Sequence, residues 1–184
     1  MANVYINKRT IFLSDGMNEE TIGIICNSIL TLIEEDNEKD DKEKNFKREI
    51  IKLYINTDGG NVYDTFALVD IILKSKTPIY TYCVGHAMSA GFALFVAGSK
   101  RYISKNSILM LHTLTAGNYS NLKKLTDSVS EYKRLNEQLE EYYLSRTEIV
   151  KERLDEIYRE QIDWYITPDE AIKLKIADEI IEEI

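Results

Sequence analysis

The stretch Gly85-His86-Ala87-Met88-Ser89-Ala90-Gly91 lies between two apolar runs of different character. Ile79 to Val84 is typical of a buried strand, and Phe92 to Ala97 is typical of a buried helix. Small residues around Ser89 permit a tight turn from strand to helix, and the first N–H groups of a helix have no partner within it. Ser89 is therefore a candidate nucleophile with N–H donors nearby for an oxyanion. The alternative is a packing contact between small residues.

The alternation of strand and helix continues on both sides of this turn. Such repeated units predict parallel strands joined by right-handed helical crossovers, which is an α/β fold. The expected elements are a strand at Thr10 to Ser14, a helix at Met17 to Ile33, a strand at Glu49 to Asn56, a turn at Thr57 to Gly60, a helix at Val62 to Leu73 and a strand at Ser107 to Leu111 that ends at His112. The charged segment from Glu34 to Glu49 predicts a solvated loop or an extension of the preceding helix, with an interaction tail as a minor alternative.

The chain changes character after Gly117. From Tyr119 to about Arg159 it is charged and helix-prone, without proline or glycine. A narrow apolar stripe at three- and four-residue steps predicts a projecting helix whose apolar face meets another subunit. The stripe consists of Leu122, Leu125, Val129, Tyr132, Leu135 and Leu139. Thr167, Pro168 and Glu170 then predict the capped start of a short helix. We expect one domain over residues 1–184, with residues 119–160 as a helical extension.

Composition excludes several functions. The chain has 184 residues and a net charge of −8, which argues against nucleic-acid binding because that needs a basic face. The apolar runs are too short to span a bilayer and no leader pattern opens the chain, so we expect no membrane segment and no secretion signal. Cys26 and Cys83 both lie in apolar segments, which predicts buried free thiols and a cytoplasmic location. No metal-ligand spacing occurs, so we expect neither a metal nor another cofactor.

A nucleophilic serine needs a general base, and this chain has two histidines. His86 lies three residues before Ser89 in a tight turn, so its ring is expected to point elsewhere. His112 ends an apolar strand that a sheet can bring beside Ser89, and it is the favoured base. For the acid that orients the base, Asp163 is distinctive because apolar and aromatic residues surround it, which predicts partial burial. The alternative for Asp163 is a residue at the end of a helix that faces water.

Five pieces of the sequence together resemble the proteolytic subunits of the ATP-dependent Clp proteases, the ClpP-like family. The similarity runs from about Arg9 to the C-terminus, and the pieces occur in the family's order with similar spacing. They are Arg9-Thr10-Ile11-Phe12-Leu13, Tyr54-Ile55-Asn56-Thr57-Asp58-Gly59-Gly60, the stretch from Gly85 to Gly91, Asn106-Ser107-Ile108-Leu109-Met110-Leu111-His112, and Asp163-Trp164-Tyr165-Ile166-Thr167-Pro168-Asp169-Glu170-Ala171.

The resemblance implies a crotonase-like βαβ superhelix with a projecting handle helix, and a barrel of two heptameric rings with the active sites inside. It implies that Ser89 is the nucleophile, His112 the base and Asp163 the orienting acid. The oxyanion-hole N–H groups fall on Gly60 and Ala90. Two strands that would pair with an extended peptide substrate begin at Asn61-Val62-Tyr63 and at Thr113-Leu114-Thr115. The implied function is a serine endopeptidase acting on peptides or unfolded proteins.

The chain also departs from the family pattern. A short segment, Met1 to Lys8, precedes the first expected strand, where the family has an N-terminal hairpin that lines the axial pore. Lys52 and Lys74 replace two aromatic residues of the groove that binds the ATPase, and charged groups disfavour an apolar docking loop. Ile162 replaces an arginine before the triad acid, and Leu114 replaces a proline after the catalytic histidine. These changes put binding of a Clp ATPase and the double ring in question.

Three alternatives to the ATPase-dependent protease follow. The first is a ClpP-like protease of phage type that processes an assembly substrate without an ATPase. The second is a non-catalytic ring subunit that stabilises a catalytic partner, although every triad position is filled in this sequence. The third is a crotonase-type acyl-CoA enzyme, which shares the fold but does not need a serine paired with a distant histidine.

Overall fold

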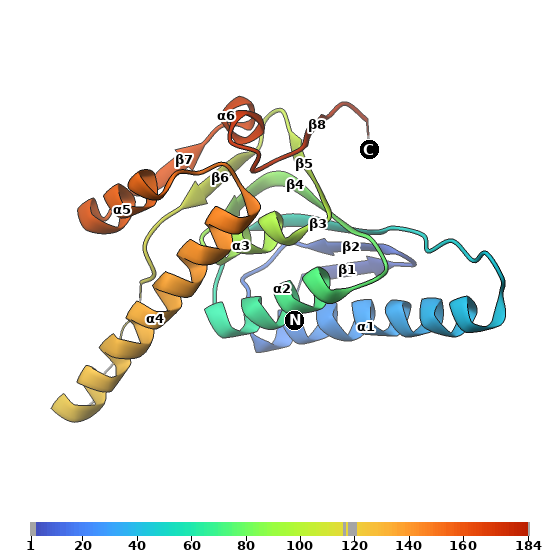
Figure 1. Ribbon diagram of the computed structural model, residues 1–184, viewed down its shortest axis with the longest axis horizontal. Coiled ribbons are helices and arrows are strands. Elements are labelled where there is room, and N and C mark those ends of the chain that lie inside the picture. The colour runs from blue at the N-terminus through green and yellow to red at the C-terminus, as the bar shows by residue number, and fades with distance from the viewer. Residues whose placement is uncertain (1–2, 116, 118–120, 184) are drawn as a thin grey trace.

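A mixed sheet of eight strands forms the centre of the computed structural model, which describes residues 3–115, 117 and 121–183 (Figure 1). Strands and helices alternate along most of the chain, so the α/β prediction is confirmed. The elements are β1 (Val4–Asn7), β2 (Thr10–Leu13), α1 (Glu19–Lys42), β3 (Ile51–Thr57), α2 (Val62–Lys74), β4 (Ile79–Met88), α3 (Ala90–Ala97), β5 (Lys100–Ser104), β6 (Ile108–Leu111), α4 (Leu122–Arg146), α5 (Lys151–Glu160), β7 (Trp164–Ile166), α6 (Pro168–Lys173) and β8 (Glu179–Ile181).

The strand order places the end of β6 beside the end of β4. Strands β2, β3, β4, β5 and β8 pair in parallel in that order, and β1 adds antiparallel to β2. Strand β4 is ten residues long and pairs with β5 over its first half. Over its last residues β4 pairs instead with β6, in parallel, and β7 adds antiparallel to β6. The chain segments that follow β4 and β6 therefore leave the sheet side by side.

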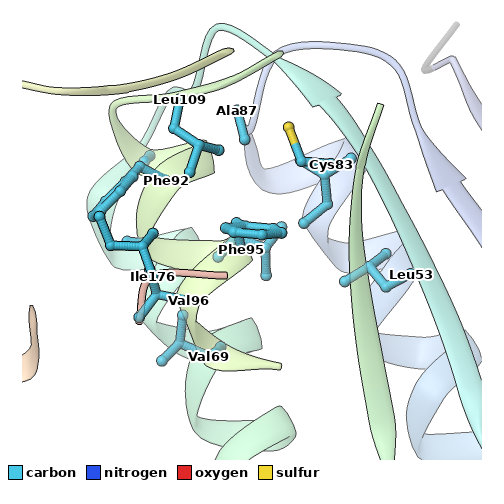
Figure 2. Close-up of a cluster of buried hydrophobic side chains, with 14 of the residues drawn as sticks. Leu53, Val69, Cys83, Ala87, Phe92, Phe95, Val96, Leu109 and Ile176 are labelled. Carbon is cyan, nitrogen blue, oxygen red and sulfur yellow. The ribbon is translucent and has the colours of Figure 1, made fainter. Parts of the chain in front are cut away.

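Helix α3 lies in the core against the sheet. All eight of its residues are buried, and Phe92 and Phe95 are among the largest fully buried side chains (Figure 2). On β3 the side chains alternate between buried and partly exposed, as expected for a strand whose two faces differ. Tyr54, Tyr82 and Tyr102 form a row across three neighbouring strands, with ring centroids 4.6 and 4.7 Å apart. This row lies on the partly exposed face.

Helix α1 is longer than the apolar pattern alone predicts. Asn18 caps its start by accepting a hydrogen bond from the Thr21 N–H, while the Thr21 hydroxyl accepts one from the Asn18 N–H. The helix continues to Lys42, so the first half of the charged segment extends the helix and the remainder is irregular. An interaction of Lys42 with Glu38 one turn earlier accompanies this extension.

The predicted long helix after Gly117 is two helices. It breaks after Arg146, where Thr147 is extended, and α5 begins at Lys151. Tyr119 and the side chain of Leu122 lie outside the described residues. The start of α4 points away from the body in Figure 1, as a projecting helix should. However, Leu135 and Tyr143 are buried, so the C-terminal half of α4 packs on the body of the molecule and does not project.

Two local predictions at the ends of the chain can be compared directly. Residues Val4–Asn7 form one strand before the first expected strand, and this strand pairs antiparallel with it as β1 with β2. Thr167 caps α6 by accepting a hydrogen bond from the Glu170 N–H, as predicted.

Cys83 is buried and Cys26 is only partly buried, both as free thiols. No helix among the described residues is long and apolar enough to cross a bilayer.

Candidate active site

Ser89 occupies the junction between β4 and α3 in a backbone conformation that is uncommon for a residue with a side chain. Its φ is 52° and its ψ is −118°. The Ser89 N–H donates to the Met110 carbonyl at 2.9 Å, which fixes the junction against β6. A sharp turn of this kind, from strand to helix, presents the serine hydroxyl outside the sheet. The predicted turn is shorter than expected, because β4 runs on through His86 and Ala87 to Met88.

His112 follows the last residue of β6 and contacts Ser89 directly. Its Nε2 lies 2.7 Å from the Ser89 Oγ, within hydrogen-bonding distance. The pairing of β4 with β6 produces this contact, because Met88, the last residue of β4, lies opposite Met110, and β6 ends one residue later at Leu111. The imidazole is partly buried, with a side-chain exposure of 19%. This geometry suits transfer of the hydroxyl proton to the imidazole.

Asp163 lies on the other side of the imidazole, but it is held loosely. Its Oδ1 is 3.5 Å from the His112 Nδ1, which is longer than a normal hydrogen bond, and its side chain is 55% exposed. The expectation that Asp163 is partly buried is therefore wrong. The cause is strand periodicity, since Trp164 and Ile166 face the core while the residues that alternate with them face outward. The alternative, a residue facing water just beyond a helix, describes Asp163 better.

His86 has a different partner from His112. Its Nε2 lies 3.0 Å from Oδ1 of Asp58, and its backbone N–H donates to the Asn56 side chain at 3.3 Å. The Asp58 side chain is 90% exposed, so this pair lies at the surface. The sequence interpretation that the His86 ring points away from Ser89 agrees with this pairing.

Gly59 and Gly60 bring the backbone of the β3–α2 turn close to Ser89. A Cβ on Gly59 would lie 2.9 Å from the Ala90 nitrogen and 3.0 Å from the Ser89 Cβ, and Gly59 has a φ of 101°. A Cβ on Gly60 would lie 2.0 Å from the Met17 carbonyl oxygen, so no side chain fits there. The hydrogen bonds around Gly60 run from the Met17 N–H to the Gly59 carbonyl and from the Asn61 N–H to the Met17 carbonyl.

Thr57 fixes this turn through its side chain, a role that the sequence analysis did not assign to it. Its hydroxyl donates to the Asp15 carbonyl at 2.6 Å and accepts from the Gly59 N–H at 3.1 Å. Its methyl group occupies the space where a Cβ on Gly91 would lie, at 2.6 Å. The pattern of a threonine two residues before a glycine is a signal for a turn closed by a hydroxyl and could have identified it.

An apolar pocket opens beside Ser89 and His112. Helices α2, α3 and α4 each contribute to its wall, together with the segment after β6. The apolar lining includes Val62, Phe66, Ala93, Leu114, Leu139 and Tyr143. The Leu114 N–H donates to the Asn136 side chain of α4 at 3.2 Å. The sequence pointed to Val62 and Leu114 but missed Phe66 and Tyr143, since helical spacing does not tell which buried side chain borders a pocket.

One predicted substrate-binding strand does not exist. Asn61 is the N-cap of α2, where its side chain accepts from the N–H groups of Tyr63 and Asp64, and Val62 begins the helix. A strand at Asn61-Val62-Tyr63 is therefore wrong, because the asparagine cap starts a helix directly after the glycine turn. Thr113, Leu114 and Thr115 are irregular and follow β6 without extending it. In the described part of the chain, no group of three or more His, Cys, Asp or Glu side chains could hold a metal ion.

Fold and site thus define an α/β protein with a serine at a strained strand-to-helix junction, in contact with a histidine from a neighbouring strand. The family model for Clp protease matches residues 1–184. A protein of Deinococcus radiodurans named ATP-dependent Clp protease proteolytic subunit is 31% identical over 180 residues, covering 97% of this chain and 82% of the relative. One of Prochlorococcus marinus, named proteolytic subunit 1 of the same protease, is 32% identical over 183 residues, covering 96% and 86%.

The chain belongs to the Clp protease family and is a serine-type peptidase. The predicted family is thereby confirmed, and so is the crotonase-like α/β fold that it implies.

Proposed function

We propose that the chain is a serine endopeptidase that cleaves peptides or unfolded proteins with Ser89 as nucleophile, His112 as general base and Asp163 as the acid that orients His112. The observation that carries the proposal is the 2.7 Å contact between the Ser89 Oγ and the His112 Nε2 at a strained junction. Non-glycine residues held at positive φ cluster at functional sites, because the surrounding structure must compensate for the strain.

The proposed mechanism has two steps. The Ser89 Oγ attacks the carbonyl carbon of the scissile bond while His112 takes its proton and then gives it to the leaving amine. Water then hydrolyses the acyl-enzyme by the same exchange of protons. The N–H groups of Gly60 and Ala90 would hold the developing oxyanion, and both are suited to it. Ala90 is the first residue of α3, where N–H groups lack helical partners, and the two hydrogen bonds that join the glycine turn to Met17 use the N–H groups of Met17 and Asn61 and not that of Gly60.

Substitution of Ser89 by alanine tests the nucleophile. We expect peptide cleavage to fall by about 10⁴- to 10⁶-fold and labelling by a fluorophosphonate probe to disappear. Thermal unfolding and the mass of the assembly should stay unchanged, since the Oγ makes its contact with His112 and not with the core. Undiminished cleavage by this variant would contradict the proposal. A wild-type protein that assembles but is not labelled would favour a non-catalytic ring subunit.

We further propose that substrate cleavage takes place inside a homo-oligomeric chamber of heptameric rings, with α4 as the handle between rings. The supporting features are the projection of α4 and its apolar Val129, which is 52% exposed. A Clp ATPase is the partner that the names of the relatives suggest. We expect the protein to act in the cytoplasm.

The chain offers one argument for an ATPase-independent assembly protease instead. The Lys52 Nζ lies 6.0 Å from the Tyr82 ring centroid, on the face of the sheet with the tyrosine row, and Lys74 is exposed at the end of α2. Ammonium groups there oppose docking of an apolar loop. Degradation of an unfolded protein, measured with and without a Clp ATPase and ATP, separates the two. Stimulation by the ATPase supports the ATPase partner, and peptide cleavage without any stimulation supports the alternative.

A further inference from the structure

The helix that begins at the candidate nucleophile has no polar side chain of its own. Helix α3 consists of Ala90-Gly91-Phe92-Ala93-Leu94-Phe95-Val96-Ala97, and every residue is buried. Apolar packing is not directional, so it restrains translation along the helix axis less sharply than hydrogen bonds do. Directional contacts at the two ends of α3 therefore matter for its exact position.

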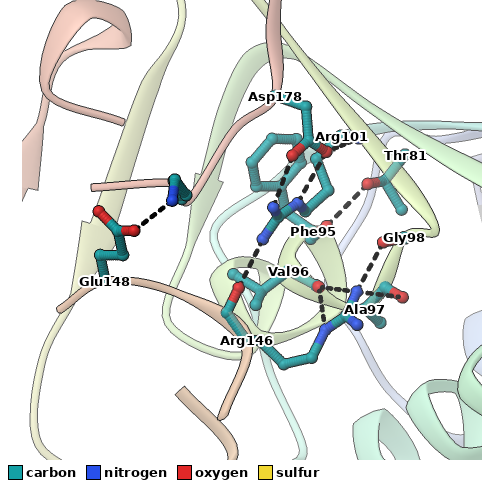
Figure 3. Close-up of polar contacts among 10 residues, drawn as sticks. Thr81, Phe95, Val96, Ala97, Gly98, Arg101, Arg146, Glu148 and Asp178 are labelled. Carbon is teal, nitrogen blue, oxygen red and sulfur yellow. Dashed lines mark hydrogen bonds and ion pairs between the residues drawn. The ribbon is translucent and has the colours of Figure 1, made fainter. Parts of the chain in front are cut away.

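Arg146, in the last turn of α4, supplies such contacts at the C-terminal end of α3 (Figure 3). Its Nη2 donates to the carbonyl oxygens of Val96, Ala97 and Gly98 at 3.2, 3.4 and 2.8 Å, and its Nε donates to the Val96 carbonyl at 3.3 Å. The last carbonyls of a helix have no partner within it, and a cation at this end also interacts favourably with the helix dipole.

The backbone of Arg146 is itself held in place. Arg101 donates from Nη1 to the Arg146 carbonyl at 2.8 Å. The same guanidinium forms a two-point ion pair with Asp178, at 3.0 Å from Nε and 2.7 Å from Nη2 (Figure 3). Arg101 is buried, whereas the Asp178 side chain is 34% exposed, and the two-point geometry of the pair fixes the orientation of the guanidinium. A hydrogen bond from the Thr81 hydroxyl to the Phe95 carbonyl, at 2.7 Å, adds a further contact to the same end of α3.

The opposite end of α3 carries the chemistry. Ser89 precedes the helix and contacts His112, which directly follows a different strand, β6. A shift of α3 along its axis would therefore change the distance from the Ser89 Oγ to the His112 Nε2, and would move the Ala90 N–H as well. A displacement of about 1 Å in an active site can lower the rate by about 10²-fold.

We infer that Arg146 is a positioning residue for catalysis, which holds α3 at the axial position where Ser89 meets His112 and the Ala90 N–H faces the oxyanion. This inference rests on the proposed function of Ser89. It assigns to the end of α4 a role in the reaction, in addition to any role of that helix in assembly.

The test compares Arg146→Ala and Arg146→Lys with the wild-type protein. We expect Arg146→Ala to lower kcat by about 10- to 10²-fold, and by more than it changes KM, because the shift of α3 misplaces the reacting atoms. The rate of labelling by a fluorophosphonate should fall by the same factor. Lysine keeps the charge but not the forked geometry, so Arg146→Lys should recover part of the loss.

Arg134→Ala is the matched control. Arg134 lies on the same helix and pairs with Glu131 at the surface, where removal of an ion pair has little effect. The Arg134→Ala variant should have the kcat and the labelling rate of the wild-type protein, and its assembly should have the wild-type mass.

The outcomes separate the two proposals. A wild-type protein in which the probe does not label Ser89 overturns the proposed function. A labelled wild-type protein together with an Arg146→Ala variant of unchanged kcat, or of raised KM at unchanged kcat, overturns the positioning role alone. If circular dichroism shows that Arg146→Ala is unfolded, Arg146→Lys decides: a lower kcat at unchanged KM supports the inference, and an unchanged kcat overturns it.

Discussion

The described part of the chain has two His–Asp pairs, and the shorter pair is not the one that contacts Ser89. His86 and Asp58 are 3.0 Å apart, while His112 and Asp163 are 3.5 Å apart. Both aspartates are exposed. The two pairs differ in their contact with Ser89. The His112 Nε2 is 2.7 Å from the Ser89 Oγ, whereas the His86 Nε2 contacts Asp58.

The pairing of strands in the sheet, and not proximity in sequence, therefore decides which histidine contacts Ser89. His86 lies within β4, on the same strand that leads to Ser89, so its side chain leaves the strand before the turn. His112 leaves the neighbouring strand β6 at the level of the turn, because β4 and β6 pair in parallel with Met88 opposite Met110. The strand ends are therefore adjacent, and a side chain from one reaches a side chain from the other.

Replacing each histidine in turn should give the largest contrast. We expect His112→Ala to lower kcat by about 10⁶-fold, as loss of the base of a triad does, because the Ser89 hydroxyl then keeps its proton. His86→Ala should retain activity within about threefold. Steady-state cleavage of a fluorogenic peptide measures both.

Two further measurements exclude unfolding and loss of assembly as causes of this difference in activity. Thermal midpoints and assembly mass should be the same in the two variants, since both imidazoles are partly exposed. If His86→Ala loses activity as severely as His112→Ala while remaining folded, the assignment of the base to His112 alone is refuted.

The sequence predicted the fold well because hydrophobic periodicity and turn residues are local signals. The strand from Ile79, the helix to Ala97 and the capped helix after Thr167 all occur at or near their predicted positions. The break between α4 and α5 after Arg146 was missed, since neither proline nor glycine marks it. The break coincides with tertiary contacts: the Arg146 carbonyl accepts a hydrogen bond from Arg101, and the Arg146 guanidinium donates to carbonyls at the end of α3.

The site was predictable only in part from residue types. Ser89 could be singled out because it lies among small residues before an apolar helix, and His112 because it ends an apolar strand. The structure brings the two together. The exposure of Asp163 could not be foreseen from its apolar neighbours, because a strand places alternate residues on opposite faces. The predicted strand at Asn61 fails for a different reason, since an asparagine after two glycines also reads as a helix cap.

A third carboxylate, Asp36, shows what a tightly held acid looks like in this chain. Its side chain is 1% exposed and accepts hydrogen bonds from both Nη atoms of Arg9, at 3.1 and 2.6 Å, and from the Thr77 hydroxyl at 2.7 Å. Burial alone would raise the pKa of Asp36. The hydrogen bonds from Arg9 and Thr77, together with the charges of Arg9 and Arg48, lower it below its ordinary value.

Asp36→Asn should therefore affect stability and not chemistry. Removing one partner of a buried ion pair costs about 3–5 kcal/mol, so we expect the free energy of unfolding at pH 7 to fall by that amount. Because the pKa of Asp36 is lower in the folded than in the unfolded state, its contribution is present above the unfolded pKa and is lost as the pH falls through the folded pKa. Urea unfolding at neutral and acidic pH measures this. A difference between variant and wild type that does not shrink in acid would contradict the role of the ionised carboxylate.

The smallest effect should distinguish the two exposed aspartates. We expect Asp163→Ala to lower kcat by about 10²-fold, less than the loss of a serine or histidine, because water can replace an exposed carboxylate in part. Asp58→Ala, which breaks the shorter His–Asp pair, should change kcat by less than about threefold. Peptide cleavage by the two variants, measured side by side, shows which aspartate matters for catalysis: Asp58, in the shorter His–Asp pair, or Asp163, whose histidine contacts Ser89. A loss in Asp163→Ala no larger than in Asp58→Ala removes Asp163 from the triad, whereas a loss equal to that of His112→Ala means that the 3.5 Å gap closes during turnover.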